Sequence, residues 1–164
     1  MNELLWFLIF FTPAYVANML PPFFRKLPFG YPIDGGRKWN GYPLLGKNKT
    51  WRGLIVGTLG GGVVGWLLQS LGLPFIWWWG LVLGFAALFG DAAKSLIKRQ
   101  VGIKPGGRWV PFDQLDFLIV AWLVSFLFVR FSWLTTLLAF TIVFAGTVLV
   151  QIAGGATGVK ADKL

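Results

Sequence analysis

Long apolar runs separated by two polar stretches dominate this sequence, and they limit what the chain can fold into. A helix needs about 20 mainly apolar residues to cross a lipid bilayer, and several of the runs are close to that length. Charged residues make up only 13% of the chain, whereas about 25% is usual in soluble domains. We therefore predict an all-α integral membrane protein, with one membrane domain over residues 1–164.

The apolar runs predict about five transmembrane helices. The first run lacks a basic leading segment and a small-residue cleavage site, so we expect a retained helix, kinked at Pro13. In the second run glycine recurs at every fourth position, which favours close packing against another helix. The predicted spans cover residues 4–20, 53–72, 74–90, 115–129 and 133–152, and the polar loops cover residues 21–52 and 91–114.

The net charge of +9 raises the possibility of a nucleic-acid partner, but the positions of the charges point to a membrane. All but one of the 15 Lys and Arg residues lie in the two loops and the C-terminal tail, the exception being Arg130. Basic residues are retained on the cytoplasmic side of membranes. We therefore expect a multi-pass protein of the cell membrane with its N-terminus outside and both loops and the C-terminus in the cytoplasm. The predicted partner is the lipid bilayer, with no nucleic acid.

Three of the six acidic residues, Asp91, Asp113 and Asp116, flank the second loop. The chain has no cysteine or histidine, which excludes thiolate and imidazole metal sites and Cys/His nucleophiles. Three carboxylates at two helix ends fit Mg²⁺, a hard cation that prefers oxygen ligands. The alternative interpretation is structural: the acids would cap helices or pair with Lys98, Arg99 or Arg108.

Basic residues and glycines surround these acids. Cations beside metal-binding carboxylates suit a polyphosphate, because the transferring group is highly negative. The sequence has no GxxxxGK[ST] motif, which excludes an ordinary P-loop hydrolase. These features predict a magnesium-dependent nucleotide site in the cytoplasmic loops, although cytoplasmic retention alone also accounts for any single cation. The basic residues are Lys94, Lys98, Arg99, Lys104 and Arg108 in the second loop and Lys47, Lys49 and Arg52 in the first.

Two segments match a known signature. The residues concerned are Gly90, Asp91, Ser95, Lys98, Arg99, Gly102, Lys104, Pro111, Asp113 and Asp116, together with Lys49-Thr50-Trp51-Arg52-Gly53. The pattern resembles that of the membrane cytidylyltransferases; it is closest to the archaeal branch, CDP-archaeol synthase, and more distant from bacterial CDP-diacylglycerol synthase. The bacterial Pro-Gly-His-Gly-Gly run is missing before Asp113, and Gln114 stands where the bacterial enzymes have Arg.

The resemblance implies a reaction in which CMP passes from CTP to an ether-lipid phosphate, 2,3-bis-O-geranylgeranyl-glycerol 1-phosphate, giving CDP-archaeol and pyrophosphate. It implies that Asp91, Asp113 and Asp116 hold Mg²⁺ and that these three and Lys98 are catalytic. The substrate-binding residues that it implies are Lys49, Thr50, Arg52, Lys94, Ser95, Arg99, Lys104 and Arg108.

Two other functions stay open at this point. Asp34-Gly35-Gly36-Arg37 is a fragment of the pattern of CDP-alcohol phosphotransferases, but no partner aspartates follow within the loop. A non-catalytic membrane protein, such as a transporter subunit or an assembly factor, would need neither the three aspartates nor CTP. The interiors of the spans hold no ionisable residue that marks a transport pathway.

Overall fold

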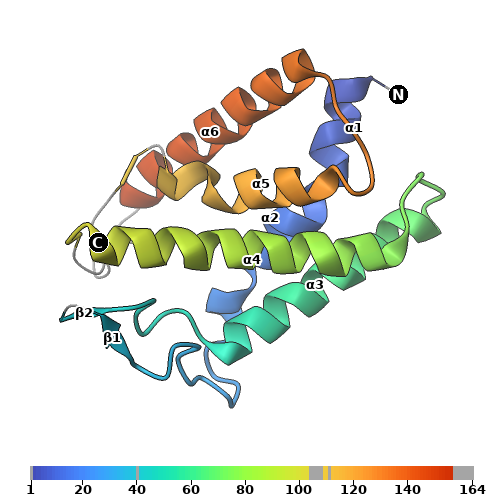
Figure 1. The fold of residues 1–164 in the computed structure, drawn as a ribbon. Helices are drawn as coiled ribbons and strands as arrows, with labels where there is room; N and C mark the ends of the chain where they lie inside the picture. Colours follow the sequence, from blue (N-terminus) through green and yellow to red (C-terminus); the bar gives the residue numbers. More distant parts are fainter. Residues whose placement is uncertain (1, 40, 104–108, 111, 157–164) are drawn as a thin grey trace.

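Helices are the main elements of the described chain, as Figure 1 shows, and this confirms the predicted all-α class. The computed structural model describes residues 2–39, 41–103, 109–110 and 112–156. The elements are α1 (Glu3–Phe10), α2 (Thr12–Met19), the 3₁₀ helix η1 (Pro21–Phe24), β1 (Lys38–Trp39), β2 (Tyr42–Pro43), α3 (Trp51–Ser70), α4 (Trp77–Gln100), α5 (Phe112–Ser125) and α6 (Trp133–Ala156). The two strands pair as a short antiparallel hairpin inside the first predicted loop.

Three segments are long and apolar enough to cross a membrane: Glu3–Phe24, Trp51–Ser70 and Trp77–Gln100. They correspond to the first three predicted spans, and together they make the chain a multi-pass membrane protein. Helices α5 and α6 correspond to the fourth and fifth. Helix α5 is about 21 Å long at 1.5 Å per residue, which is shorter than a hydrocarbon core of about 30 Å. The number of five spans and their orientation stay predictions.

The first segment is kinked where the sequence predicts it, because the helix breaks at Phe11 between α1 and α2. Pro13 has no N–H to donate to the carbonyl of Ile9. The hydroxyl of Thr12 donates to that carbonyl instead, at 2.7 Å. Phe11 and its neighbours Phe7 and Phe10 are fully buried in the core, so the kink lies at the centre of the packing.

Helices α3 and α4 pack through glycines, which confirms the close approach predicted from the glycine spacing. A Cβ on Gly61 would lie 2.5 Å from the carbonyl oxygen of Gly80, and one on Gly57 would lie 2.5 Å from that of Ala17 in α2. Neither position has room for a side chain. The glycine face of α3 therefore fixes how close α2 and α4 can come.

Residues 91–114 do not form a loop throughout. The prediction is wrong for residues 112–114, which begin α5, and for residues 91–100, which continue α4. This segment contains no glycine or proline, and most of its residues form helices well. Helix α4 ends at Gln100, and Gly102 lies just beyond it with a φ of 80°, which suits a residue without a side chain. The N–H groups of Gly102 and Ile103 donate to the carbonyls of Arg99 and Lys98 and complete the end of the helix.

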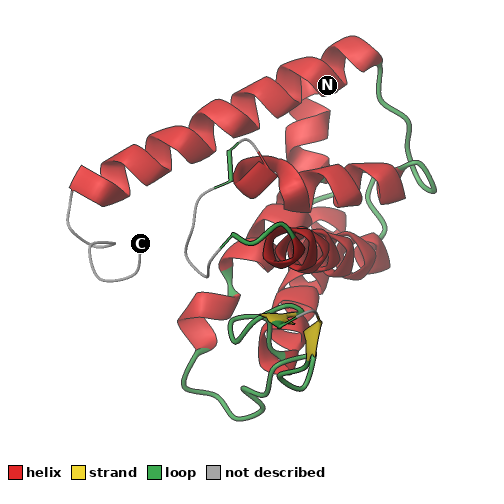
Figure 2. Ribbon diagram, turned by 60° about the vertical axis from the view of Figure 1, so that its left-hand side comes forward, coloured by secondary structure: helices red, strands yellow, loops and turns green. Residues whose placement is uncertain are grey.

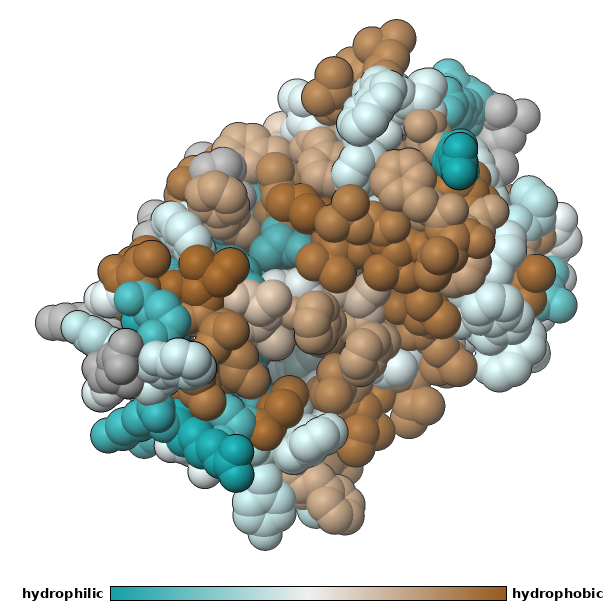
Figure 3. Space-filling model, viewed as in Figure 1, coloured by the Kyte–Doolittle hydropathy of each residue, from teal (hydrophilic) through white to brown (hydrophobic). Residues whose placement is uncertain are grey.

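The long helix α4 lies at the centre of the molecule (Figure 1), with α5 and α6 on one side and the hairpin on the other. Figure 2 shows the same order from a second direction, with α4 almost end-on. Figure 3 shows hydrophobic side chains over the long helices and hydrophilic ones gathered over the hairpin. The polar first loop therefore lies against one end of an apolar helical body.

Candidate active site

A single glycine lets α4 and α5 touch at the predicted site. A Cβ on Gly90 would lie 2.6 Å from the carbonyl oxygen of Asp116 and 2.9 Å from a methyl group of Val120. Helix α5 can therefore approach α4 closely only because position 90 has no side chain. This contact brings Asp116 beside Asp91. The sequence shows the glycine but not this role, because the partner lies on another helix.

One face of α4 carries most of the polar residues predicted for the site. Asp91, Lys94, Ser95 and Lys98 are spaced three and four residues apart, so they share one side of the helix. Ser95 is buried, and its hydroxyl donates to the backbone carbonyl of Asp91 at 2.8 Å. Its hydroxyl is thus bonded within the helix.

The ammonium group of Lys94 lies at the point where the three aspartates meet. Its Nζ atom is 3.4 Å from Oδ1 of Asp91, 3.1 Å from Oδ1 of Asp113 and 2.8 Å from Oδ2 of Asp116. The sequence predicts these four residues for the site, but it does not show that one cation touches all three acids.

Asp113 is held from two further directions. Lys98, which is buried, donates to both of its carboxylate oxygens, at 2.9 and 2.7 Å. The backbone N–H of Trp109 donates to Oδ2 at 2.6 Å. The pairing of an acid with Lys98 agrees with the structural alternative considered from the sequence. The convergence of three acids on one point goes beyond what that alternative requires.

Lys49 reaches the site from the first loop, 42 residues away in the sequence, and its ammonium group pairs with Asp91. The preceding part of the loop fixes its position. The N–H of Ile33 donates to the carbonyl of Lys49 at 2.9 Å, and the N–H of Trp51 donates to that of Tyr31 at 3.0 Å. The loop and the two helices therefore build one cluster, in which Lys49, Lys94 and Lys98 face Asp91, Asp113 and Asp116.

The chemistry of this cluster fits a divalent cation. Its acids supply only carboxylate oxygens, the ligands that Mg²⁺ prefers, and the ammonium of Lys94 marks a position that all three acids can reach. Within the described part of the chain, no three acids face one another in the arrangement of a metal centre. In this structure, the ammonium group of Lys94 contacts all three acids. Asp91, Asp113 and Asp116 thus fit the role of ligands, but the lysine at their centre must first move.

Other predicted residues lie in the surrounding structure. Thr50 caps α3, since its hydroxyl accepts the N–H of Gly53 at 3.2 Å. Arg52 donates to the carbonyl of Leu27 at 2.5 Å, and Arg99 donates to that of Ile103 at 2.6 Å. The guanidinium groups of both arginines therefore bind backbone carbonyls in this structure. Lys104 and Arg108 lie outside the described residues, and the substrate contacts of all five stay predictions.

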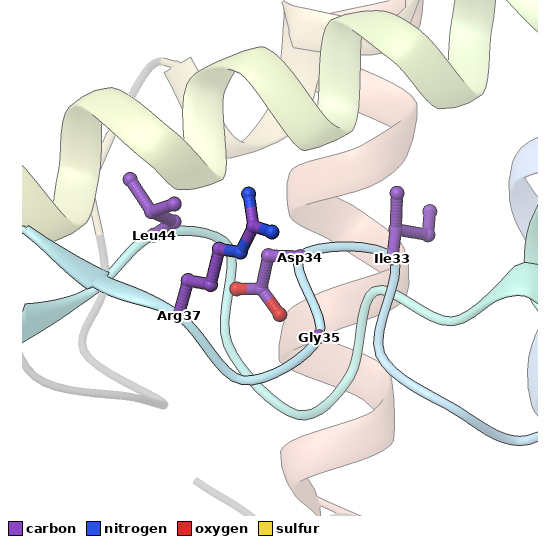
Figure 4. Close-up of a pocket in the computed structure, with 5 residues that line it drawn as sticks. All are labelled: Ile33, Asp34, Gly35, Arg37 and Leu44. Atoms are coloured by element: carbon purple, nitrogen blue, oxygen red, sulfur yellow. The ribbon is translucent and has the colours of Figure 1, made fainter.

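Asp34 organises the first loop beside a pocket of about 340 Å³, which Figure 4 shows. Its carboxylate accepts the backbone N–H groups of Leu45 at 2.8 Å and Gly36 at 2.9 Å. Partial burial by itself raises the pKa of Asp34, but these bonds and one from Gly46 outweigh it and hold the pKa below its ordinary value. The carboxylate of Asp34 thus bonds to the backbone of its own loop.

The chain is similar to known proteins over most of its length. Residues 1–160 match the profile of a family described as CarS-like, CDP-archaeol synthase. A CDP-archaeol synthase from Methanosphaerula palustris is 35% identical over 90% of this chain and 96% of its own length. One from Thermococcus onnurineus is 40% identical over 74% of each chain.

A solved structure described as an intramembrane enzyme for archaeal membrane lipid biosynthesis is 31% identical to this chain. The match covers 91% of this chain and 94% of the chain in that structure, with a TM-score of 0.81. The fold is therefore similar over nearly the whole length of both proteins.

Proposed function

The chain belongs to the CDP-archaeol synthase family, and on that basis we propose that it is a membrane cytidylyltransferase. The reaction transfers CMP from CTP to 2,3-bis-O-geranylgeranyl-glycerol 1-phosphate, an ether-lipid phosphate. The products are CDP-archaeol and pyrophosphate. The reaction would serve the synthesis of archaeal phospholipids.

One observation carries this proposal beyond family membership. Three aspartates and three lysines converge where α4, α5 and the first loop meet, next to apolar helices. Nucleotidyl transfer needs cations that offset the charge of a triphosphate and a site for a divalent ion. A substrate with a phosphate head and isoprenoid tails would also need that site at the edge of an apolar body.

Asp91, Asp113 and Asp116 are the residues that would hold Mg²⁺. When bound, the ion would offset the negative charge of the phosphates. Lys49 and Lys98 each pair with one of these acids, Asp91 and Asp113, and would also meet phosphate oxygens of the substrates. Ammonium groups bind phosphate through charge-assisted hydrogen bonds.

The transfer itself needs no proton. An oxygen of the lipid phosphate attacks the α-phosphorus of CTP and forms a new P–O bond. The bond between the α-phosphorus and its bridging oxygen to the β-phosphorus breaks, and the electron pair leaves with pyrophosphate. The attacking oxygen is already anionic, so no general base is required. The lysines orient the two anions and offset the charge that develops on the leaving group.

We place the site on the cytoplasmic side, where CTP is available. Support comes from the first loop, which carries Lys49 into the site and is rich in basic residues, as cytoplasmic loops are.

Since the chain has no cysteine, a single Lys26→Cys substitution gives a specific site for labelling in the first loop. In inverted vesicles a membrane-impermeant thiol reagent should modify it directly, whereas in right-side-out cells it should react only after permeabilisation. The reverse pattern would place the loop outside.

The position of a radiolabel tests the reaction. Purified protein in detergent receives Mg²⁺, the ether-lipid phosphate and CTP labelled either at the α- or at the γ-phosphorus. We expect the α-label in the lipid extract and the γ-label in pyrophosphate. A γ-label in the lipid would indicate a kinase instead. No transfer of either label by a folded preparation would argue for a non-catalytic protein.

A further inference from the structure

We propose that Lys94 is an internal counter-ion of the active site, which holds the three aspartates together until a metal ion takes its place. This inference rests on the proposed function, because it concerns the ion that the function needs. It assigns to Lys94 a positioning role that differs from plain substrate binding.

The first support is the position of the ammonium group. It lies within 3.4 Å of a carboxylate oxygen of Asp91, Asp113 and Asp116, and Lys94 is the described residue that contacts all three. The surroundings are largely closed, since the side chain of Lys94 is 14% exposed and that of Asp116 is 5% exposed. Three carboxylates this close would repel one another strongly without a cation among them.

The second support is the contrast with the other lysines. Among the three acids, Lys98 contacts Asp113 alone and Lys49 contacts Asp91 alone. Both can stay paired when an ion binds between the aspartates. Lys94 cannot, because its ammonium occupies the point toward which all three acids turn. An ion placed there would also be repelled by the ammonium at close range.

As a consequence, the metal ion and the ammonium group of Lys94 compete for the three aspartates. Metal binding must push the ammonium of Lys94 out of the cluster, so the metal binds less tightly than three carboxylates alone would allow. A triphosphate offers the displaced ammonium a new anionic partner. CTP and the metal ion should therefore strengthen each other's binding, and by linkage the effect should be equal in both directions.

Metal affinity in variants tests the competition directly. Mn²⁺ binding to the detergent-solubilised protein is followed by electron paramagnetic resonance, without substrates. We expect Lys94→Met to bind Mn²⁺ on the order of tenfold more tightly than the wild type, because one unit charge has left the cluster. Lys26→Met is the matched control, since it removes the same charge from an exposed position in the first loop, and its affinity should equal that of the wild type. Unchanged or weaker binding in Lys94→Met would overturn the proposal.

A measurement on the wild type avoids variants that fold poorly. An amine-reactive reagent modifies lysines, and mass spectrometry reports the extent at each one. Without metal, the amine of Lys94 should react slowly, because three acids hold it. Saturating Mg²⁺ should raise its modification several-fold and leave Lys26 unchanged. Addition of a non-hydrolysable CTP analogue should lower it again. The same reactivity of Lys94 with and without Mg²⁺ would contradict the displacement.

These outcomes are distinguishable from a failure of the proposed function. If the protein transfers CMP but the modification of Lys94 does not change with Mg²⁺, the proposed function stands and the counter-ion role is wrong. If Mg²⁺ raises the modification of Lys94 but no label is transferred, the counter-ion role stands and the proposed reaction is wrong.

Discussion

Two polar clusters lie at opposite ends of α5, and they use carboxylates in opposite ways. Beyond its C-terminal end, Glu3 accepts hydrogen bonds from the backbone N–H of Ser132 at 2.7 Å and from the hydroxyl of Thr135 at 2.6 Å. At its N-terminal end, three aspartates face three lysines. One cluster joins a single acid to neutral donors, whereas the other gathers six charges.

The difference separates a carboxylate that serves the fold from the three that we propose to bind a metal ion. The bonds of Glu3 tie the start of α1 to the start of α6, where the helix N-terminus also favours a negative charge. Both oxygens of its carboxylate accept hydrogen bonds from neutral groups of Ser132 and Thr135. The aspartates instead repel one another, and their charges are offset by lysine side chains. Such an arrangement serves the fold poorly and suits the binding of ions.

The largest expected effect is the loss of transfer in the charged cluster. Asp113→Asn should lower CMP transfer by about 10²-fold or more, the range seen when a group that stabilises transition-state charge is removed. The same acid-to-amide change at the other end, Glu3→Gln, should leave transfer within about twofold. Initial rates at saturating CTP give both values. If both variants lost the same share of the transfer rate, the two clusters would not differ in their role in the reaction.

The next effect comes from the helix contact that builds the charged cluster. Gly90→Ala should displace α5, because its Cβ would lie 2.6 Å from the carbonyl of Asp116. Overpacking of this kind costs about 1–3 kcal/mol, and transfer should fall by about tenfold since the aspartates would no longer align. Gly146→Ala in α6 is the matched control, because a Cβ there meets nothing within 4 Å. A wild-type rate in Gly90→Ala would show that the contact does not position the site.

A smaller effect is expected on stability at the neutral cluster. Glu3→Gln keeps the size of the side chain but weakens the bonds from Ser132 and Thr135, because an amide oxygen is a poorer acceptor than a carboxylate. The midpoint of thermal unfolding in detergent should fall slightly, with transfer unaffected at lower temperature. An unchanged midpoint would mean that the Glu3 cluster contributes little to joining α1 and α6.

The smallest effect concerns pH and the first loop. The pKa of Asp34 is lower in the folded protein than in the unfolded chain. Its contribution to stability is therefore present above the unfolded-state pKa of about 3.9 and is lost as the pH falls through the folded-state value. The thermal midpoint of the wild type should exceed that of Asp34→Asn at neutral pH, and the two should converge below about pH 4. A difference that persists at low pH would contradict this assignment.

Much of the fold follows from the sequence, because local patterns determine it. Apolar length locates the helices, Pro13 predicts the kink, and the glycine spacing predicts the packing of α3 on α4. The end of α4 is the exception. The charges between Asp91 and Gln100 suggest a loop, but they lie on a segment of good helix formers, and several of them share one face of the extended helix.

The members of the charged cluster are also predictable, since residue type and charge identify Asp91, Asp113, Asp116 and the lysines. Their pairing is not. The contact of Lys49 with Asp91 joins residues 42 positions apart, and the central place of Lys94 depends on the approach of α5 over Gly90. Such contacts depend on how the helices pack, which the spacing of one segment does not show.

The most direct test of the charged cluster compares three proteins in one assay. Wild type, Asp113→Asn and Glu3→Gln receive α-labelled CTP and the geranylgeranyl ether-lipid phosphate, with Mg²⁺ or with EDTA. We predict labelled CDP-lipid from the wild type and from Glu3→Gln in Mg²⁺, none from either in EDTA, and almost none from Asp113→Asn. Full transfer by Asp113→Asn, or by the wild type in EDTA, would contradict a metal-dependent site at the three aspartates.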